Sequence, residues 1–422
     1  MIYHDDPFLG DIDCSEVAPL IDHPLFQRLR FIRQLGMAFL IFPRAQHTRF
    51  DHSIGAYERT RRRMDKWRRA GILKRDAARD IEIFGLLHDI GHGPLSHVIE
   101  AVTKVGHDEK GLAILAELEK TIKRCGGDYD HIRAMFDHTN PFFKAVHDKN
   151  LGTEKFDYLE RDSSVTDSGK PKFRDLPFHV TFRDGEIVVP YRDDLLDTAL
   201  HIQEFYMDMY KNVYLRPSTA VLSRLMQKLV FALLEANELT EDRLWPMIDG
   251  DLSAAIMNSQ QEWARDSMQR IRTRTWPRIA ILIKPKQFPE SDVYDGTRQL
   301  QKVFSVEMER IKKLAGYFNH NPKRLARVEQ EIESQFGFPE HSIVIVPLSD
   351  TQRFKTQEVQ VYSEADGITP LSRWRPAGIE RLSEIADSYV CLRVAVNPDH
   401  RERLASNDIS QQVVDHLFSK IS

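Results

Sequence analysis

Apolar residues recur at intervals of three and four through most of the first 240 residues, as on one face of a helix. In the segment 16–36, Leu25, Leu29 and Ile32 follow this spacing, and Gly36 supplies a C-terminal stop. The same pattern predicts further helices over 51–70, 76–89, 109–122, 130–137, 191–214 and 217–237.

A different pattern begins in the middle of the chain. In 178–190, two β-rich runs surround Asp184-Gly185, which predicts a hairpin. Beyond residue 275, strands are predicted over 278–286, 342–348, 358–363 and 388–396, and helices over 294–316, 322–335 and 409–420. We therefore expect a mostly α protein with a β-hairpin insertion, divided into residues 1–275 and an α+β C-terminal region, 276–422, that serves as an interface or regulatory surface.

Composition excludes several classes of protein. The chain has 422 residues, 41% of them hydrophobic and 29% charged, with a net charge of −4, so it is globular and not generally basic. Cys14, Cys125 and Cys391 lie far apart, which argues against a disulfide framework and fits a reducing compartment. The sequence shows no secretory signal and no apolar run long enough to span a bilayer, so we expect a cytoplasmic protein without a membrane partner.

Histidines gather in the first third of the chain, where 11 of the 17 lie within 150 residues. The stretch HDIGHGPLSH, residues 88–97, contains His88, His92 and His97 together with Asp89. Imidazole and carboxylate ligands suit Fe, Mn, Ni, Zn or Mg better than a thiophilic ion. Buried structural histidines and a closed structural zinc site are the alternatives, but no cysteine lies nearby, which favours an open catalytic site.

Several motifs together resemble a known superfamily. His52, His88-Asp89 and an acidic residue in EKFDYLERD resemble the pattern of the HD-domain metal-dependent phosphohydrolases. The ordered motifs DDPFLGDI, FQRLRFIRQLG, FPRAQHTRFDHSIG, HDIGHGPLSH and FDYLERD are most similar to the deoxynucleoside triphosphate triphosphohydrolases, over roughly residues 3–237. The resemblance implies an HD-domain helical bundle core within residues 1–275.

The resemblance also implies a divalent metal ion as cofactor, with Mn, Fe, Mg, Co, Ni and Zn as the candidates. Its implied ligands are His52, His88 and Asp89. The family's last ligand is an aspartate, but this sequence has Glu154 at that position, with Asp157 as the alternative carboxylate.

The resemblance further assigns His92, His97 and His107 to the phosphates and to proton transfer in catalysis. The implied substrate-binding residues are Gln34 and Leu35 at the sugar, Arg49 at a phosphate, Lys155, Tyr158 and Asp162 on the phosphate and sugar side, and Tyr214 against the sugar or base. Tyr206 stands where a basic phosphate-binding residue is expected.

The implied activity is hydrolysis of deoxynucleoside triphosphates to deoxynucleoside and inorganic triphosphate, by a homo-oligomer with a nucleotide substrate. One alternative is an HD-type enzyme for another phosphoester: a nucleoside monophosphate, a modified nucleotide or a nucleic-acid end. The other is a catalytically decayed scaffold that binds nucleotide or nucleic acid. The basic run ERTRRRMDKWRR would support nucleic-acid binding, although a solvated helix face is the favoured interpretation of it.

Overall fold

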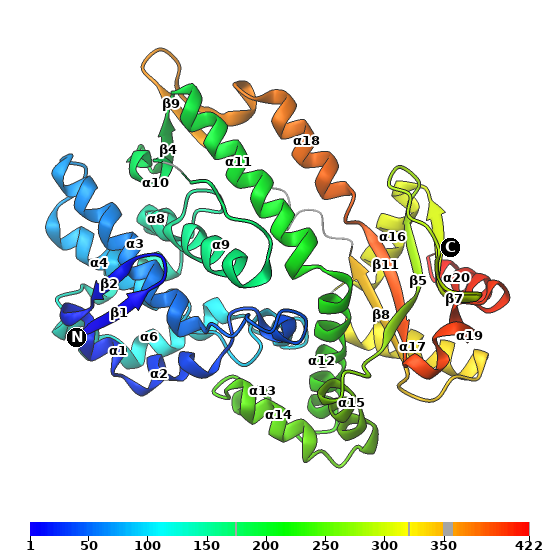
Figure 1. The fold of residues 1–422 in the computed structure, drawn as a ribbon. Helices are drawn as coiled ribbons and strands as arrows, with labels where there is room; N and C mark the ends of the chain where they lie inside the picture. The colour runs from blue at the N-terminus through cyan, green and yellow to red at the C-terminus, as the bar shows by residue number, and fades with distance from the viewer. Residues whose placement is uncertain (174, 320, 349–357, 422) are drawn as a thin grey trace.

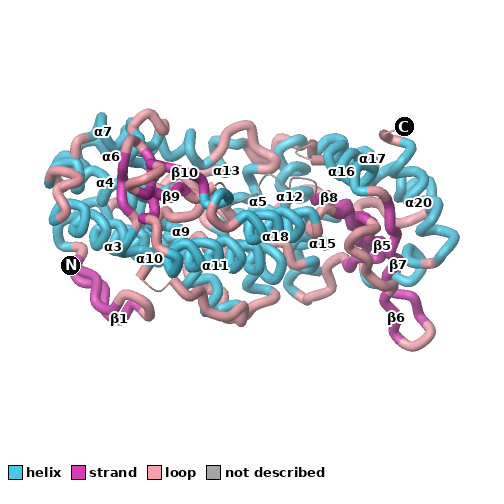
Figure 2. The backbone as a smooth tube through the Cα atoms, turned by 90° about the horizontal axis from the view of Figure 1, so that it is seen from above, coloured by secondary structure: helices cyan, strands magenta, loops and turns pink. Residues whose placement is uncertain are grey.

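The computed structural model describes residues 1–173, 175–319, 321–348 and 358–421. The molecule is elongated, with its two termini at opposite ends (Figures 1 and 2). Helices of the N-terminal half occupy one end, and a five-stranded sheet with its covering helices occupies the other (Figure 2). No helix in the described ranges is long and apolar enough to cross a membrane.

The N-terminal end is a helical bundle. Its helices are α3 (Arg49–Arg69), α4 (Arg75–Leu87), α6 (His107–Arg124), α7 (Tyr129–Phe136) and α9 (Thr153–Thr166). The helix α3 begins at a capping box, in which Thr48 and Asp51 satisfy each other's backbone N–H groups. Buried apolar residues of α3 and α4, among them Trp67 and Phe84, form the centre of the core. The predicted helices over 51–70, 76–89, 109–122 and 130–137 are therefore confirmed.

The single helix predicted over 16–36 is wrong. This segment forms α1 (Ala18–Ile21), α2 (Pro24–Gln27) and 3₁₀ turns over Ser15–Val17, Arg28–Phe31 and Gly36–Leu40. Pro24 has no backbone N–H to donate and so cannot stand in the interior of a helix. A new helix starts at Pro24 instead, and the His23 side chain caps it by accepting the Leu25 N–H at 3.3 Å. Gly36, at φ +49°, lies at the start of a turn instead of ending a helix.

The predicted hairpin is present. Strands β3 (Thr181–Arg183) and β4 (Glu186–Pro190) pair antiparallel around Asp184-Gly185, whose φ angles of 52° and 80° suit a tight hairpin turn. Strands β9 (Gln360–Ser363) and β10 (Gly367–Pro370) extend this sheet, with β9 parallel to β4. The chain after residue 358 therefore returns to the N-terminal half, and the division at residues 275 and 276 remains a proposal.

Two long helices run along the middle of the molecule (Figure 1). They are α11 (Asp193–Met209), which continues as a π-helical turn over Tyr210–Tyr214, and α12 (Pro217–Glu235). Both helices were predicted, with the break at Pro217. The helix α12 packs against the sheet of the C-terminal region. Its buried apolar residues form one hydrophobic core with the strand residues Val344 and Val346.

The C-terminal region is α+β, as predicted. Its sheet has the order β6-β7-β5-β11-β8. The strands are β5 (Arg278–Pro285), β6 (Val293–Asp295), β7 (Arg298–Val306), β8 (Ile343–Leu348) and β11 (Cys391–Val396), and the main helices are α16 (Met308–Phe318), α17 (Pro322–Phe336) and α20 (Asn407–Ser419). The helix predicted over 294–316 is wrong in its first half, which forms β7.

The remaining elements connect these parts. They are β1 (Ile2–Asp6), β2 (Gly10–Asp13), α5 (His97–Glu100), α8 (Lys144–His147), α10 (Leu176–His179), α13 (Glu241–Leu244), α14 (Asp249–Met257), α15 (Glu262–Arg272), α18 (Pro376–Asp387) and α19 (Arg401–Ala405). The fold class is confirmed: the structure is mostly α, with a helical bundle core, a hairpin insertion and an α+β C-terminal region.

Candidate active site

The loop that follows α4 brings the histidines of HDIGHGPLSH together. Gly91 packs against the start of α6, where a Cβ atom would lie 2.0 Å from the carbonyl oxygen of His107. Leu95 and Ser96 adopt φ angles of 55° and 50°, which are unfavourable for residues with side chains. Asp249, at the start of α14, accepts the Leu95 N–H at 2.9 Å and so stabilises this strained turn before His97.

Three of the predicted ligands, His52, His88 and Asp89, lie close together, and Glu154 lies next to His88. The Nε2 atom of His88 lies 3.2 Å from Nε2 of His52, 3.4 Å from an oxygen of Asp89 and 3.3 Å from an oxygen of Glu154. The donor atoms of His52, His88 and Asp89 all lie within 4.8 Å of one another, a spacing at which they could share one metal ion, whereas Glu154 lies next to His88 at the side of this group. This donor group (His52, His88 and Asp89) thus comes from α3 and from the loop directly after α4, and α9 places Glu154 beside it.

The tautomers of the two imidazoles support metal binding. The Nδ1–H group of His52 donates to Asp157 at 2.9 Å, and that of His88 donates to the Gly85 carbonyl at 2.9 Å. The two Nε2 atoms therefore face each other at 3.2 Å. Burial opposes a charge on His52, but the hydrogen bond to Asp157 and the nearby carboxylates outweigh it and raise the pKa of His52. Burial lowers the pKa of His88, which keeps it neutral as a ligand must be. The donor group thus fits a divalent cation.

Asp157, the alternative carboxylate, lies behind His52, on the Nδ1 side of the imidazole and away from the Nε2 atom that faces His88. Its fully buried carboxylate accepts hydrogen bonds from His52 and from Arg161, the latter at 2.8 Å, and Arg59 lies 3.3 Å away. Despite burial, the charge of Arg161 and the bond from His52 hold the pKa of Asp157 well below its usual value. Such a carboxylate fixes the imidazole orientation and raises its basicity toward a metal.

A second cluster lies beside the donor group. One oxygen of Glu100 lies 3.0 Å from Nδ1 of His107, 3.2 Å from Nδ1 of His97 and 3.6 Å from Nδ1 of His92. The rings of His92 and His107 stack, with centroids 4.0 Å apart. The donor atoms of these four residues lie within 4.8 Å of one another, so they also have the spacing of possible cation ligands.

The two stacked imidazoles differ in protonation. Burial and the neighbouring charges of Arg49 and His107 hold the pKa of His92 well below its usual value, so His92 is neutral. Burial also opposes the charge on His107, but the hydrogen bond and charge of Glu100 outweigh it and raise the pKa of His107. His107 is therefore the member of the pair that takes up a proton more readily.

Both clusters open into one cavity of about 430 Å³. All the predicted site residues line it except His88, which lies fully buried behind the wall, and Lys155. Elsewhere on its lining, Tyr214 donates to Asp162 at 2.7 Å, and His47 bonds the other oxygen of Asp162 at 2.8 Å. The buried amide oxygen of Gln34 has no hydrogen-bond partner among the described residues.

Phosphate-binding charge is limited. Arg49 lines the cavity but donates to Asp89 at 2.6 Å and to Ser96 at 3.1 Å. Lys155 instead donates to the Lys149 carbonyl, and its Nζ lies 3.4 Å from the ring centroid of Tyr206. Burial lowers the pKa of Lys155 to about 7. The structure thus does not bring the Lys155 ammonium into the cavity.

Sequence reasoning missed two residues of this site. Glu100 occupies the turn of helix after His97, a spacing at which its carboxylate can return to the histidine. His147 lines the cavity and bonds the second oxygen of Glu154 at 3.0 Å. His147 stands in one of four His-Asp pairs in the sequence, so its dipeptide alone could not distinguish it.

The bundle and its donor group define a class of helical protein with a histidine–carboxylate metal site. Residues 49–168 match the family model of the HD domain. The chain therefore carries an HD domain, which confirms the resemblance seen in the motifs.

Relatives agree with this assignment. The chain is 30% identical over 258 residues to an HD domain-containing protein of Acanthamoeba polyphaga mimivirus, covering 52% of this chain and 55% of the relative. It is 29% identical over 218 residues to an uncharacterised protein of Bacillus subtilis, covering 49% of each. The chain thus spans about half the length of these relatives. Over 100 residues it is 42% identical to the deoxynucleoside triphosphate triphosphohydrolase SAMHD1 of Bos taurus, covering 22% of this chain and 17% of that protein.

Solved structures share the whole fold. A phosphohydrolase of Bacteroides thetaiotaomicron superposes with a TM-score of 0.70 at 18% identity, covering 94% of this chain and 100% of that one. A hypothetical protein of Aquifex aeolicus superposes with a TM-score of 0.65 at 20% identity, covering 96% and 99%. The bundle and the C-terminal region therefore occur together in these proteins.

Proposed function

We propose that this protein is a metal-dependent phosphohydrolase that converts deoxynucleoside triphosphates to deoxynucleosides and inorganic triphosphate. The observation that carries the proposal is the shared cavity, which joins a metal-type donor group, a histidine–carboxylate cluster and other polar residues. Its volume of about 430 Å³ suits a nucleotide. The local similarity to the Bos taurus triphosphohydrolase supports this substrate class.

The chemistry follows from the residues. His52, His88, Asp89 and Glu154 would hold a divalent ion, which lowers the pKa of water and polarises a phosphoryl oxygen. Hydrolysis forms a bond from water to the α-phosphorus and breaks the bond to the 5′-oxygen. His107, kept protonated by Glu100, can give its proton to that leaving oxygen, a contribution of about 10²–10⁴-fold.

The cavity also offers contacts for a sugar. The unpartnered amide oxygen of Gln34 is a ready acceptor for a sugar hydroxyl, because a buried acceptor without a donor is costly. Leu35 provides an apolar surface beside it, and Tyr214 with Asp162 forms the opposite polar wall. We propose that Gln34 receives the 3′-hydroxyl of a deoxynucleotide.

A second candidate is an HD-type enzyme for a less highly charged phosphoester. Lys155 points to the Lys149 carbonyl, Tyr206 takes the place of a basic residue, and Arg49 is shared with Asp89. Few free cations are thus available to neutralise a triphosphate of about four negative charges. A nucleoside monophosphate or a modified nucleotide would place less demand on this site.

The deciding experiment identifies the phosphate product. Protein reconstituted separately with Mn, Fe, Mg and Co is incubated with each deoxynucleoside triphosphate, with the His88→Ala/Asp89→Ala double variant as control. Release of triphosphate by the native protein alone supports the lead proposal, whereas orthophosphate or pyrophosphate supports the second candidate. Nucleotide binding without turnover in any metal would indicate a decayed scaffold. Light scattering of the same sample tests the proposed homo-oligomer.

A further inference from the structure

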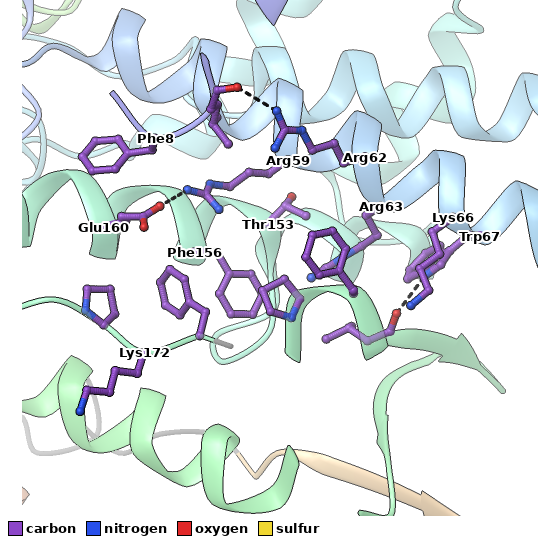
Figure 3. A pocket seen from close by; sticks show the side chains of 16 residues that line it. Phe8, Arg59, Arg62, Arg63, Lys66, Trp67, Thr153, Phe156, Glu160 and Lys172 are labelled. Carbon is purple, nitrogen blue, oxygen red and sulfur yellow. Dashed lines mark hydrogen bonds and ion pairs between the residues drawn. The ribbon is translucent and has the colours of Figure 1, made fainter. Parts of the chain in front are cut away.

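A second cavity, of about 410 Å³, lies on another face of α3 and α9 (Figure 3). The helix α9 divides its side chains between the two cavities. Thr153, Phe156 and Glu160 line the second one, whereas Tyr158 and Asp162 line the first. Among the described residues, no side chain lines both, so the second cavity is separate from the candidate active site.

The body of this cavity is aromatic and apolar. Its apolar lining comprises Phe8, Leu9, Trp67, Phe156, Phe173, Phe178, Val180, Pro171 and Pro177. The rings of Phe156 and Phe173 pack edge to face, with centroids 5.0 Å apart, and Phe178 is 54% exposed. An exposed phenylalanine at the mouth of an aromatic cavity offers a surface for a planar apolar group.

The charge of the lining is strongly positive. Five basic side chains (Arg59, Arg62, Arg63, Lys66 and Lys172) accompany a single acid, Glu160. Figure 3 shows four of the five along the wall formed by α3. Lys66 has no ion-pair partner among the described residues, and Arg62 is exposed while bonding Glu58 and the Leu9 carbonyl.

Arg63 strengthens this bias toward anions. It is only 5% exposed, and it donates to the Ala145 carbonyl at 2.8 Å. Its Nε and Nη2 groups have no hydrogen-bond partner within the described part of the chain. A buried guanidinium without a paired carboxylate is costly, and a nearby anion would offset its charge. The neighbouring basic residues Arg61 and Arg62 are instead neutralised by Glu58.

We propose that this second cavity binds an organic anion with a planar apolar body. Its rings would lie among Phe156, Trp67 and Phe178, and its phosphate, sulfonate or carboxylate would face Lys66 and Arg63. This site goes beyond the proposed hydrolase function.

The second cavity is connected to the metal donors by a short chain of contacts. Arg59 lines the cavity, pairs with Glu160 and lies 3.3 Å from one oxygen of Asp157. The other oxygen of Asp157 accepts the His52 Nδ1–H at 2.9 Å. An anion that draws Arg59 toward itself would remove one of the cations that neutralise the Asp157 carboxylate. Asp157 would then bond His52 more strongly, and His52 would become a stronger electron-pair donor to a metal ion. This second step rests on the proposed metal site.

Binding is tested with 8-anilinonaphthalene-1-sulfonate as the probe, by fluorescence titration of the intact protein. We expect Lys66→Glu to raise the Kd of the probe at least fivefold and Phe178→Ala at least threefold. The matched control is Arg69→Glu, the same charge change at an exposed position of α3 outside the cavity, which should alter the Kd less than twofold. Equal effects of Lys66→Glu and Arg69→Glu would overturn the proposal. So would equally tight binding of uncharged N-phenyl-1-naphthylamine.

The connection is tested by calorimetric titration of Mn²⁺ with and without saturating probe. We expect the probe to lower the Kd of Mn²⁺ about threefold and to have no such effect in Lys66→Glu. An unchanged Kd would refute the connection while leaving the binding site intact. Absence of Mn²⁺ binding in both arms would instead count against the proposed metal site, and the probe titration would still decide the cavity.

Discussion

Glu154 reaches the metal donors from α9 with one methylene more than an aspartate has, and its two oxygens have different partners. One oxygen lies 3.3 Å from Nε2 of His88, and the other bonds Nδ1 of His147 at 3.0 Å. His147 thus fixes the longer side chain beside His88, at the side of the group formed by His52, His88 and Asp89. Whether Glu154 binds the metal ion is therefore a question for mutation.

Replacing this carboxylate should weaken metal binding. We expect Glu154→Gln to raise the Kd of Mn²⁺ about 10–100-fold, the range found when a group that supports a metal site is removed. Glu154→Asp should lose less, because the carboxylate remains. Calorimetric titration measures both, with Glu117→Gln, an exposed carboxylate on α6, as control. Unaltered affinity in Glu154→Gln would show that Glu154 is not a ligand.

Lys155 gives a prediction about pH. Burial lowers its pKa from 10.5 to about 7, so between these values the unfolded chain holds a proton that the folded chain lacks. Stability therefore rises with pH over this window, and the folded state is penalised at pH 7 and below. We expect Lys155→Met to be more stable than the native protein by about 1–2 kcal/mol at pH 7, with the gap closing toward pH 10.

Urea unfolding at pH 7, 8.5 and 10 measures this difference, and the Lys155→Met variant also reports on catalysis. Retained turnover would agree with the position of Lys155 against the Lys149 carbonyl. Lost turnover in a more stable variant would show that the ammonium enters the cavity when substrate binds. A variant less stable than the native protein at pH 7 would contradict the pKa argument.

Individual site residues were predictable where a motif contains them. His52, His88 and Asp89 stand in ordered motifs, and the structure brings their donor atoms within 4.8 Å of one another. Glu100 and His147 stand in no such motif, and their roles depend on how the loops around α5 and α8 fold. The motif around Lys155 predicted that its side chain would lie on the phosphate and sugar side, but the side chain instead donates to the Lys149 carbonyl. That carbonyl belongs to a turn for which the sequence gives no signal.

At the scale of elements, the contact between α3 and α9 builds the site. Gly55 of α3 lies directly against Asp157 and Arg161 of α9, where a Cβ atom would come within 2.1 Å of a carboxylate oxygen of Asp157. The absence of a side chain at Gly55 lets Asp157 reach His52. The close approach of the two helices thus serves both packing and ligand orientation.

Gly55→Ala should therefore damage stability and the site together. We expect a loss of roughly 2–4 kcal/mol, since both α9 side chains must move, and weaker Mn²⁺ binding. The matched control is Gly316→Ala on α16, where a Cβ meets nothing within 4 Å and the helix should gain about 0.5–1 kcal/mol. Thermal unfolding of both variants tests this contrast, and equal stability of the two would exclude a tight contact at Gly55.

Element prediction succeeded where local pattern and packing agree. The pattern over 51–70 became α3 because its apolar face meets α4 and α9. The pattern over 16–36 failed because Pro24 outweighs the spacing of Leu25, Leu29 and Ile32. In 294–316, the strand β7 was not predicted because it is only partly buried and carries many polar residues. It forms because β5 pairs with it, and that contact cannot be seen in the local pattern.

At the scale of the whole molecule, a buried ionic cluster joins α12 to the C-terminal region. Glu329 of α17 is fully buried, with Arg224 at 3.3 Å and Lys228 at 3.1 Å, both from α12. The carboxylate also accepts the N–H of Ile345 in β8 at 2.9 Å, and Lys228 donates to the Ile343 carbonyl at 2.8 Å. One carboxylate thus connects a central helix, a peripheral helix and the edge of the sheet.

Removing this carboxylate should uncouple the C-terminal region from the bundle. Glu329→Ala would leave the buried Arg224 without its carboxylate and Lys228 with only Glu333, at 3.9 Å, at a cost of about 3–5 kcal/mol. Scanning calorimetry should then show the single unfolding transition split into two, with the lower one assigned to the sheet. Glu331→Ala, on the same helix but with partly exposed partners, should cost less than about 1 kcal/mol. If Glu329→Ala lowers one undivided transition, the two ends of the molecule unfold as a unit through the apolar contacts of α12 alone.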